Sequence, residues 1–389
     1  MPNPKKSSIP KPVKLIFAGG FLGSGKTTAL AALAKRLIQR GNRIGIITND
    51  QTENLVDTVI VREMLSELQV PVEEVVKGCF CCKFDELIRH MEKIMAHKPD
   101  FLLGEPVGSC TDFVAAVANP VKIYYKDRFR FAPFSIIVDP DRVRGLLLNE
   151  QETGFPEEVS YLFSKQLEEA DLIVLNKVDL MEEKERDRLL KALSDRFSGK
   201  EYLALSAKQE EGIEKWLGIL LSGRPGANTV LRQIDYDRYA AAEAVLGWLN
   251  AAVRLRSPSL FDAADLLRSL AHTLKKSFSQ KKAQVGHLKF VVTGGGKSMW
   301  GNLTSLESEP SISAHSIGKI NKGSLIINAR VRIEPPELEA AVRKALKIVS
   351  KELAVKYRVD DLQCFSPAYP EPPHIIRETV GAEESQDAR

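Results

Sequence analysis

Short apolar runs alternate with helix-like spacing of apolar residues over the first 220 or so positions of the chain. Six runs are expected to be strands. Two of them, 44–47 and 172–175, are apolar on both faces, as is typical of parallel strands covered by helices on each side. We therefore predict an α/β fold with a doubly wound, mostly parallel sheet that binds ligands at the carboxyl ends of its strands. The six expected strands are 13–19, 43–48, 100–104, 134–139, 171–176 and 202–206.

The pattern changes after the polar, turn-forming stretch 222–228. Helices are expected at about 237–254 and 261–278. Leu288, Phe290 and Val292 then occupy alternate positions, and 327–333 alternates more cleanly, which is typical of strands with one face in water. A further helix is expected to begin at Pro335, with its apolar residues on one face. This half of the chain predicts a smaller α+β domain, one sheet with helices on one side.

These patterns divide the chain into four parts. A proline-broken arm (1–12) and a proline-rich, then polar tail (371–389) are expected to be disordered, and they flank domains at 13–222 and 223–370. The net charge of +4 does not suggest a nucleic-acid partner. No signal-type segment and no long apolar stretch is seen, so we expect a cytoplasmic protein without membrane contact.

A glycine-rich motif follows the first predicted strand and opens a helix. Gly20–Thr27 reads G-x-x-x-x-G-K-T, the phosphate-binding P-loop in its usual strand–loop–helix context. Its glycines let backbone N–H groups surround an anion, and the helix N-terminus adds positive potential. We predict that Lys26 reaches the β- and γ-phosphates and that Thr27 ligates Mg²⁺. A chance match in a glycine-rich turn is the alternative. The predicted phosphate-binding residues are Gly20, Gly23, Ser24, Gly25, Lys26, Thr27 and Thr28.

A second motif indicates which base the nucleotide carries. Asn176-Lys177-Val178-Asp179 follows a buried strand, and its carboxylate can accept two hydrogen bonds from guanine, a donor pair that adenine lacks. An unpaired buried carboxylate is costly, so this contact discriminates strongly. We predict that Asn176, Lys177 and Asp179 bind guanine and that Ser206, Ala207 and Lys208 supply backbone N–H groups to its carbonyl. The alternative for the first motif alone is a polar turn after a strand.

Acidic residues between these motifs are candidates for the Mg²⁺ and hydrolysis groups. Glu105 closes a strand at the Walker B position, where a carboxylate holds Mg²⁺ or orients the attacking water. Asp50, Glu53 and Asp57 follow the second strand, where a switch segment is expected. A solvated loop charge or helix cap is the alternative for each acid. The predicted catalytic set is Lys26, Thr27, Asp50 and Glu105.

Three of the five cysteines lie within four positions, at Cys79, Cys81 and Cys82. Such thiols can become three soft ligands for Zn²⁺ or another thiophilic ion, with the fourth position left to water, a partner or a distant side chain. Buried thiols or a redox pair are the alternative, although adjacent cysteines suit an ordinary disulfide poorly. Cys110 could approach this group but is more often a core residue, and Cys364 is expected to be structural or exposed.

In order and spacing, these motifs resemble the CobW-like GTPases, relatives of the GTPases that mature nickel hydrogenase and urease. The resemblance implies a slow GTPase that carries a transition metal, commonly Zn²⁺ or Co²⁺, to a client metalloprotein. It assigns metal binding to Cys79, Cys81 and Cys82, guanine to Asn176, Lys177 and Asp179, and Mg²⁺ to Thr27 and Glu105. It covers residues 13–222 by motif and extends more loosely to the second domain.

The chain departs from that family in three places. Asn49–Asp57 lacks the usual glycine-containing loop, Pro106–Ser109 replaces the usual Ser-Gly, and no His-rich tract is present, which argues against metal storage. A second hypothesis is therefore a GTP-dependent assembly factor for a cofactor-bearing enzyme, such as a corrinoid protein, that carries no metal. A third is a P-loop kinase or ATPase, against which Asp179 argues. The expected assembly is a monomer or a nucleotide-dependent homodimer.

Overall fold

The computed structural model describes residues 11–52, 56–150, 154–313 and 315–380. The first domain contains an eight-stranded sheet with order β3-β2-β4-β1-β6-β7-β8, in which β5 also pairs with β1. Within the described residues its strands pair in parallel. The predicted doubly wound α/β class is therefore confirmed. The strands are β1 (Val13–Gly19), β2 (Ile44–Asn49), β3 (Val72–Val75), β4 (Phe101–Glu105), β5 (Phe129–Phe131), β6 (Ser135–Val138), β7 (Leu172–Leu175) and β8 (Glu201–Ala204).

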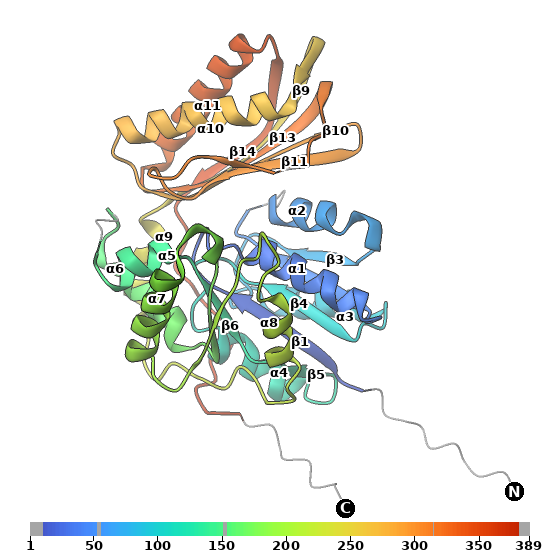
Figure 1. Cartoon of the computed structure of the whole chain (residues 1–389), viewed down its shortest axis with the longest axis vertical. Helices are drawn as coiled ribbons and strands as arrows, with labels where there is room; N and C mark the ends of the chain where they lie inside the picture. Colours follow the sequence, from blue (N-terminus) through green and yellow to red (C-terminus); the bar gives the residue numbers. More distant parts are fainter. Residues whose placement is uncertain (1–10, 53–55, 151–153, 314, 381–389) are drawn as a thin grey trace, which may run out of the picture.

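Helices cover both faces of this sheet and bury its apolar strands in two cores (Figure 1). Leu30, Leu33 and Leu37 lie fully buried at helical spacing in α1, which follows the P-loop. The helices are α1 (Lys26–Gln39), α2 (Val56–Met64), α3 (Phe84–Met95), α4 (Asn119–Tyr124), α5 (Pro140–Arg142), α6 (Glu157–Glu168), α7 (Glu183–Arg196), α8 (Ile213–Leu220) and α9 (Tyr236–Ala244), with single 3₁₀ or π turns at Ser66–Leu68, Val114–Ala118, Val143–Leu147 and Val178–Leu180.

The second domain is a six-stranded antiparallel sheet, order β12-β11-β10-β13-β9-β14, with two helices on one face. Alternate residues of its strands point into the core against these helices, among them Leu288, Phe290 and Ile327. This is the α+β arrangement that the alternating pattern predicted. Its elements are β9 (Gly247–Asp262), α10 (Ala263–Gln280), β10 (Val285–Gly294), β11 (Lys297–Leu303), β12 (Ser311–Ile312), β13 (Lys319–Val331), α11 (Pro335–Glu352) and β14 (Lys356–Phe365).

The other face of this sheet lies over the first domain, with α2 directly beneath it (Figure 1). Val56 and Ile60 of α2 pack against Val291 of β10, with Trp300 and Ile326 at the edge of the cluster. The carboxyl ends of β1, β2 and β4 therefore face the polar side of the second sheet.

Three sequence expectations need comment. The helix expected at 237–254 is wrong from residue 247 onward, because apolar residues there alternate in β9 instead of following helical spacing. The domain boundary at 223 stays a prediction; α9 packs against α6, and Tyr239 and Leu246 join the first domain's core. Disorder from 371 does not hold for residues 371–380, whose backbone bonds to Ala115 and Asn119.

The expected disordered arm falls mostly, and the end of the expected tail wholly, outside the described residues. No helix among those described is both long and apolar enough to cross a membrane.

Candidate nucleotide and thiol site

The P-loop lies between β1 and α1 with its glycines in conformations that other residues rarely adopt. Gly20 has a φ of +134°, and a Cβ there would stand 2.1 Å from the Ile137 carbonyl oxygen. Gly25, the N-cap of α1, has a φ of +91°, and its missing side chain leaves room for the Asn176 amide. Lys26 Nζ donates to the carbonyls of Gly20 (2.8 Å) and Phe21 (3.3 Å), while burial lowers its pKa. The backbone is thus shaped for an anion.

Thr27 joins two acidic side chains from different strands and helices. Its hydroxyl lies 2.9 Å from Glu105 Oε1 at the end of β4 and 2.9 Å from Asp57 Oδ1 in the first turn of α2. Burial, reinforced by the Asp57 charge, raises the pKa of Glu105 to about 7. Glu105 Oε2 is buried without a hydrogen-bond partner among the described residues. One hydroxyl and two carboxylates, one of which has an unsatisfied oxygen, fit Mg²⁺, which takes further ligands from substrate phosphates and water.

Asp57 stays strongly acidic although it is largely buried. Burial alone would raise its pKa, but the ammonium of Lys289, 2.5 Å away on β10, and the Thr27 hydroxyl bring it down to about 2. Glu53, another candidate from the sequence, lies outside the described residues.

Asp50 is held by the second domain. Its Oδ1 accepts from Arg330 Nη2 at 2.6 Å and its Oδ2 from Asn328 Nδ2 at 3.2 Å, both on β13. Arg330 is fully buried, lies 4.0 Å from the centroid of the Trp248 ring, and donates to the Leu249 and Ala329 carbonyls. The predicted catalytic role of Asp50 stays a prediction, while its observed partners make it an anchor between the domains.

The guanine-motif residues lie beside the P-loop. Asn176 Nδ2 donates to the Ser24 carbonyl (2.8 Å), and its Oδ1 accepts from the backbone N–H of Ala207 (2.9 Å). Ser206 donates to Asp179 at 2.6 Å, which orients that half-buried carboxylate. Asn176 therefore ties both base-reading loops to the phosphate loop. Lys208 is exposed at the end of this group.

Lys177 contributes a link that the sequence did not suggest. It has a positive φ of 62° and pairs with Asp139, at the carboxyl end of β6, so the pKa of Asp139 falls despite its burial. Three residues on, Arg142 is buried and donates to the carbonyls of Val285, Gly286 and Thr304 in the second domain. The base-reading loop is thus one short segment away from the second sheet.

Four thiols form two close pairs. Cys79 Sγ lies 3.3 Å from Cys82 Sγ, and Cys81 Sγ lies 3.1 Å from Cys110 Sγ on the loop after β4. All five cysteines are free, and the pKa values of Cys79, Cys81 and Cys110 are raised by their mutual hydrogen bonds and by burial. Among the described residues, no group of three or more His, Cys, Asp or Glu side chains has a geometry that could hold a metal ion. The predicted thiols are gathered, and their metal stays a prediction.

Asn49 connects the thiol loop to the nucleotide site. This buried residue ends β2, immediately before Asp50, and its Nδ2 donates to the carbonyls of Val75 (3.0 Å) and Gly78 (2.7 Å). Its Oδ1 accepts from the backbone N–H of Phe80 at 2.8 Å. Glu243 of α9 makes a second connection by accepting from Ser109 and Gln51. A movement of the thiol loop must therefore act on the strand end that leads into the switch.

Residues 14–203, which include the P-loop, the thiol loop and the Asn176–Asp179 motif, match the family model described as CobW/HypB/UreG, nucleotide-binding domain. These residues are a CobW-type nucleotide-binding domain. The predicted family is thereby confirmed for this part of the chain.

Curated relatives match the chain over the same region. It is 30% identical over 181 residues to the zinc chaperone CobW of Sinorhizobium, which covers 42% of this chain and 50% of the relative. It is 28% identical over 205 residues to the zinc chaperone CobW of Pseudomonas aeruginosa (46% and 52%) and 26% over 179 residues to the zinc-regulated GTPase metalloprotein activator 1 of Schizosaccharomyces pombe (44% and 40%). The chain thus spans about half the length of the curated relatives it matches or less.

Solved structures show a weaker likeness. HypB from Helicobacter pylori in complex with nickel is 17% identical with a TM-score of 0.38, covering 57% of this chain and 92% of that one. Zn(II)-bound YjiA GTPase from E. coli is 16% identical with a TM-score of 0.32, covering 86% and 99%.

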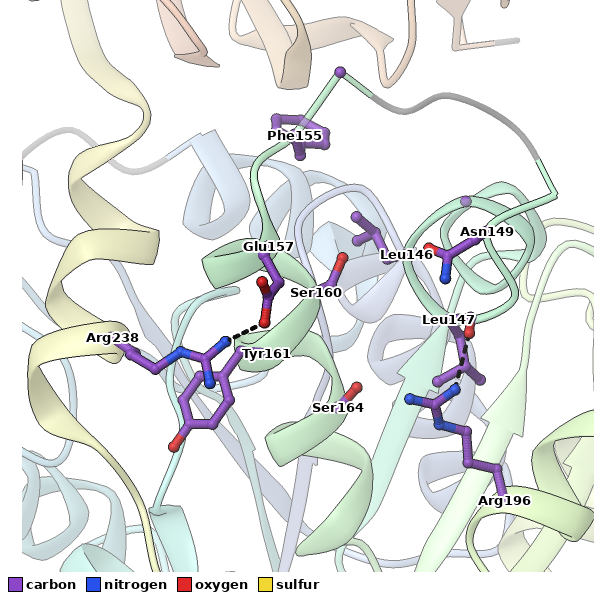
Figure 2. Close-up of a pocket in the computed structure, with 12 residues that line it drawn as sticks. Leu146, Leu147, Asn149, Phe155, Glu157, Ser160, Tyr161, Ser164, Arg196 and Arg238 are labelled. Carbon is purple, nitrogen blue, oxygen red and sulfur yellow. Dashed lines mark hydrogen bonds and ion pairs between the residues drawn. The ribbon is translucent and has the colours of Figure 1, made fainter.

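A cavity of the CobW-type domain lies apart from these motifs. It borders α6 and residues 145–149 and 154–155, and Figure 2 shows Glu157, Ser160 and Ser164 along the helix. Arg238 pairs with Glu157 at 2.9 Å and lies 4.2 Å from the centroid of the Tyr161 ring, so the cationic group at one end is already paired. None of the predicted site residues lines this cavity.

Sequence reasoning missed the residues that the second domain brings to the CobW-type site. The alternating pattern places Lys289 and Arg330 on the side of their strands opposite the apolar residues, and in the structure that side lies over the P-loop. The alternation with apolar residues predicts which face of the sheet is polar, but no local signal in the sequence indicates that the P-loop lies opposite that face.

Proposed function

We propose that this chain is a GTP-hydrolysing metallochaperone that binds a transition metal, Zn²⁺ or Co²⁺, and passes it to a client metalloprotein. One observation carries the proposal. The thiol loop and the start of the switch segment share the side chain of Asn49, whose three hydrogen bonds leave little freedom for either to move alone.

Choice of GTP is supported by Asp179 and its supporting shell. Ser206 orients the carboxylate, and Asn176 fixes the loop against the P-loop. An Asp179→Asn variant should lose affinity for GTP and gain affinity for xanthosine triphosphate, because its amide offers a donor where xanthine carries a carbonyl. Equal competition by ATP in the wild-type protein would instead favour the kinase or ATPase hypothesis.

Hydrolysis is assigned to the groups around Thr27. Thr27, Asp57 and Glu105 would hold Mg²⁺, which neutralises phosphate charge in such sites. Lys26 would hold the phosphates. The buried Glu105 carboxyl, which has an unsatisfied oxygen, would hold the Mg²⁺ ion or orient the attacking water.

The cargo site is proposed at Cys79, Cys81 and Cys82. Cys79 Sγ lies 3.3 Å from Cys82 Sγ, and Cys81 Sγ lies 3.1 Å from Cys110 Sγ outside the proposed set. Tetrahedral thiolates around Zn²⁺ stand roughly 3.8 Å apart, from Zn–S distances of about 2.3 Å. Metal uptake would therefore separate the thiols and remove their protons, so affinity should rise with pH. The matched relatives named as zinc chaperones support this choice of cargo.

The deciding experiment is equilibrium dialysis of Zn²⁺ and Co²⁺, with GDP and with a non-hydrolysable GTP analogue. The triple variant Cys79→Ser, Cys81→Ser, Cys82→Ser should lose high-affinity binding, and Cys364→Ser, remote from the cluster, is the matched control. Nucleotide-dependent affinity in the wild type is expected. If the triple variant binds metal as tightly as wild type, the cargo assignment fails.

A second candidate is favoured by the burial of Cys79 and Cys81 and by the absence, among the described side chains, of a preformed metal group. In it the chain is a GTP-dependent assembly or activation factor whose thiols only pack. A GTPase rate indifferent to metal, together with GTP-gated client binding, would select this function.

A further inference from the structure

The polar face of the second sheet supplies a cation to the nucleotide site. Along β10, Leu288, Phe290 and Val292 enter the second domain's core, while His287, Lys289 and Val291 face the first domain. Lys289 thus emerges from a rigid strand in the centre of the sheet, between β11 and β13. Its position is set by the strand pairing and needs no loop movement.

Lys289 and the P-loop residue Thr27 contact the same carboxylate, that of Asp57. Lys289 Nζ lies 2.5 Å from Asp57 Oδ1, and the same carboxylate oxygen accepts from the Thr27 hydroxyl at 2.9 Å. The side chains of Lys289 and Asp57 are 19% and 17% exposed, so neither is sealed in the interface. The space they border is a cavity between the domains, also lined by Lys26, Thr27 and Glu105.

The two basic residues of this face differ in how free they are. Arg330 is 0% exposed and is fully engaged by Asp50 and two carbonyls. For Lys289, Asp57 is the ion-pair partner found among the described residues, and the ammonium retains donors that can turn to the cavity.

We propose that Lys289 contacts the terminal phosphate of the bound nucleoside triphosphate and is a catalytic residue donated by the second domain. The inference rests on the GTP hydrolysis proposed above. In that reaction a water oxygen bonds to the γ-phosphorus, the bond from phosphorus to the bridging oxygen breaks, and the electron pair leaves with GDP. The water proton ends on phosphate or in solvent. An ammonium beside the transferring group stabilises the charge that spreads over these oxygens.

The same contact makes the second domain sensitive to the γ-phosphate. Asp57 begins α2, and Val56 and Ile60 of that helix pack on Val291, two residues from Lys289. A phosphate that takes donors of Lys289 competes with Asp57 for them, so it changes the attachment of α2 to β10. GDP lacks the group that competes.

The test compares Lys289→Ala with Lys297→Ala, an exposed lysine on the neighbouring strand β11, and with Lys289→Arg. Affinities for GDP and for GppNHp are measured by calorimetry, and hydrolysis by single-turnover kinetics. Lys289→Ala should weaken GppNHp binding roughly 10- to 100-fold, the range for one hydrogen bond to a charged group, and slow hydrolysis at least as much. GDP affinity should be unchanged, and the melting temperature should fall by the same amount with and without GDP, because Asp57 loses its ion-pair partner. Arginine should restore part of both losses.

The proposal is overturned if Lys289→Ala keeps the wild-type GppNHp affinity and rate. It is overturned equally if GDP binding falls with GppNHp binding, because Lys289 would then be structural, or if the wild type does not distinguish the two nucleotides. Absence of GTP turnover in the wild type is a different result. It rejects the proposed function, while the GppNHp-to-GDP affinity ratio of the variants still reports on the phosphate contact.

Discussion

The ion pair between Asp50 and Arg330 should be a main attachment of the switch segment to the second domain. Arg330 is completely buried and Asp50 is 11% exposed by side chain, with 2.6 Å between the charged atoms. Asp50→Asn would leave a buried guanidinium without its counter-charge, which costs about 3–5 kcal/mol when one partner of a buried pair is removed. At roughly 2–4 °C per kcal/mol for a domain of 150–250 residues, the melting temperature should fall by about 10 °C.

Arg330→Met should lower the free energy of unfolding by less than Asp50→Asn does. Asp50 keeps its hydrogen bonds from Asn328 and from the backbone of Gln51 and borders the cavity, so its charge remains partly solvated. The loss of the stacked contact with Trp248 adds roughly 0.5–2 kcal/mol.

A double-mutant cycle of Asp50→Asn and Arg330→Met, followed by urea unfolding and calorimetry, measures the coupling. We expect the double variant to be more stable than the sum of the single effects by about 1–3 kcal/mol, as for residues in direct contact. Additive effects, within the roughly 0.5 kcal/mol seen for independent sites, would refute this account of the interface.

Three further predictions follow from other contacts. Asn49→Ala removes three hydrogen bonds to the thiol loop and the strand beside it, so Zn²⁺ should no longer change the GTPase rate. Asn321→Ala, at an exposed position of β13, serves as a control, and an unchanged metal response in Asn49→Ala would contradict the link. Burial raises the pKa of Glu243 from 4.5 to about 8, so the folded state binds the proton more tightly than the unfolded state and stability falls as pH rises through that window. Between pH 5 and pH 8, the free energy of unfolding of the wild type, measured with urea, should fall by roughly 3–4 kcal/mol more than that of Glu243→Gln, at 1.36 kcal/mol per pKa unit. Parallel pH profiles of the two proteins would refute this prediction. Arg377→Ala breaks two 2.8 Å contacts to the buried carboxylate of Asp112 and should cost about 2 kcal/mol, whereas Arg343→Ala, from an exposed pair, should cost less than about 1 kcal/mol; equal urea midpoints would contradict the difference.

Local sequence signals predicted the first domain well because its strands are apolar on both faces and its motifs sit at their ends. Strands β3 and β5 were missed since Val72–Val75 and Phe129–Phe131 are short and carry charged residues. In the second domain, β9 was mistaken for a helix, because a compact apolar run around Trp248 and Leu249 fits both periods. The alternation in β10 and β13 was clear, and both were predicted.

The sequence motifs identify candidate site residues, whose roles stay predictions, but they do not identify the partners of these residues from the second half of the chain. Lys289 and Arg330 come to the P-loop only because β10 and β13 lie side by side above it, an arrangement fixed by packing that no local pattern encodes. Cys110 is a smaller case of the same kind. Its distance from Cys81 depends on how the loop after β4 folds back over the thiols.

These contacts converge on the short stretch that links β2 to α2. Asn49 is bonded to the thiol loop, Asp50 to Arg330, and Asp57 to both Thr27 and Lys289. Three structural units, the thiol loop, the phosphate loop and the second sheet, therefore bond to the residues at the two ends of this stretch. If each unit has its own preferred position for that stretch, a ligand that favours one position must change the affinity at the other two, and by linkage the coupling is reciprocal. Metal at the thiols should then alter GppNHp affinity by the same factor by which GppNHp alters metal affinity.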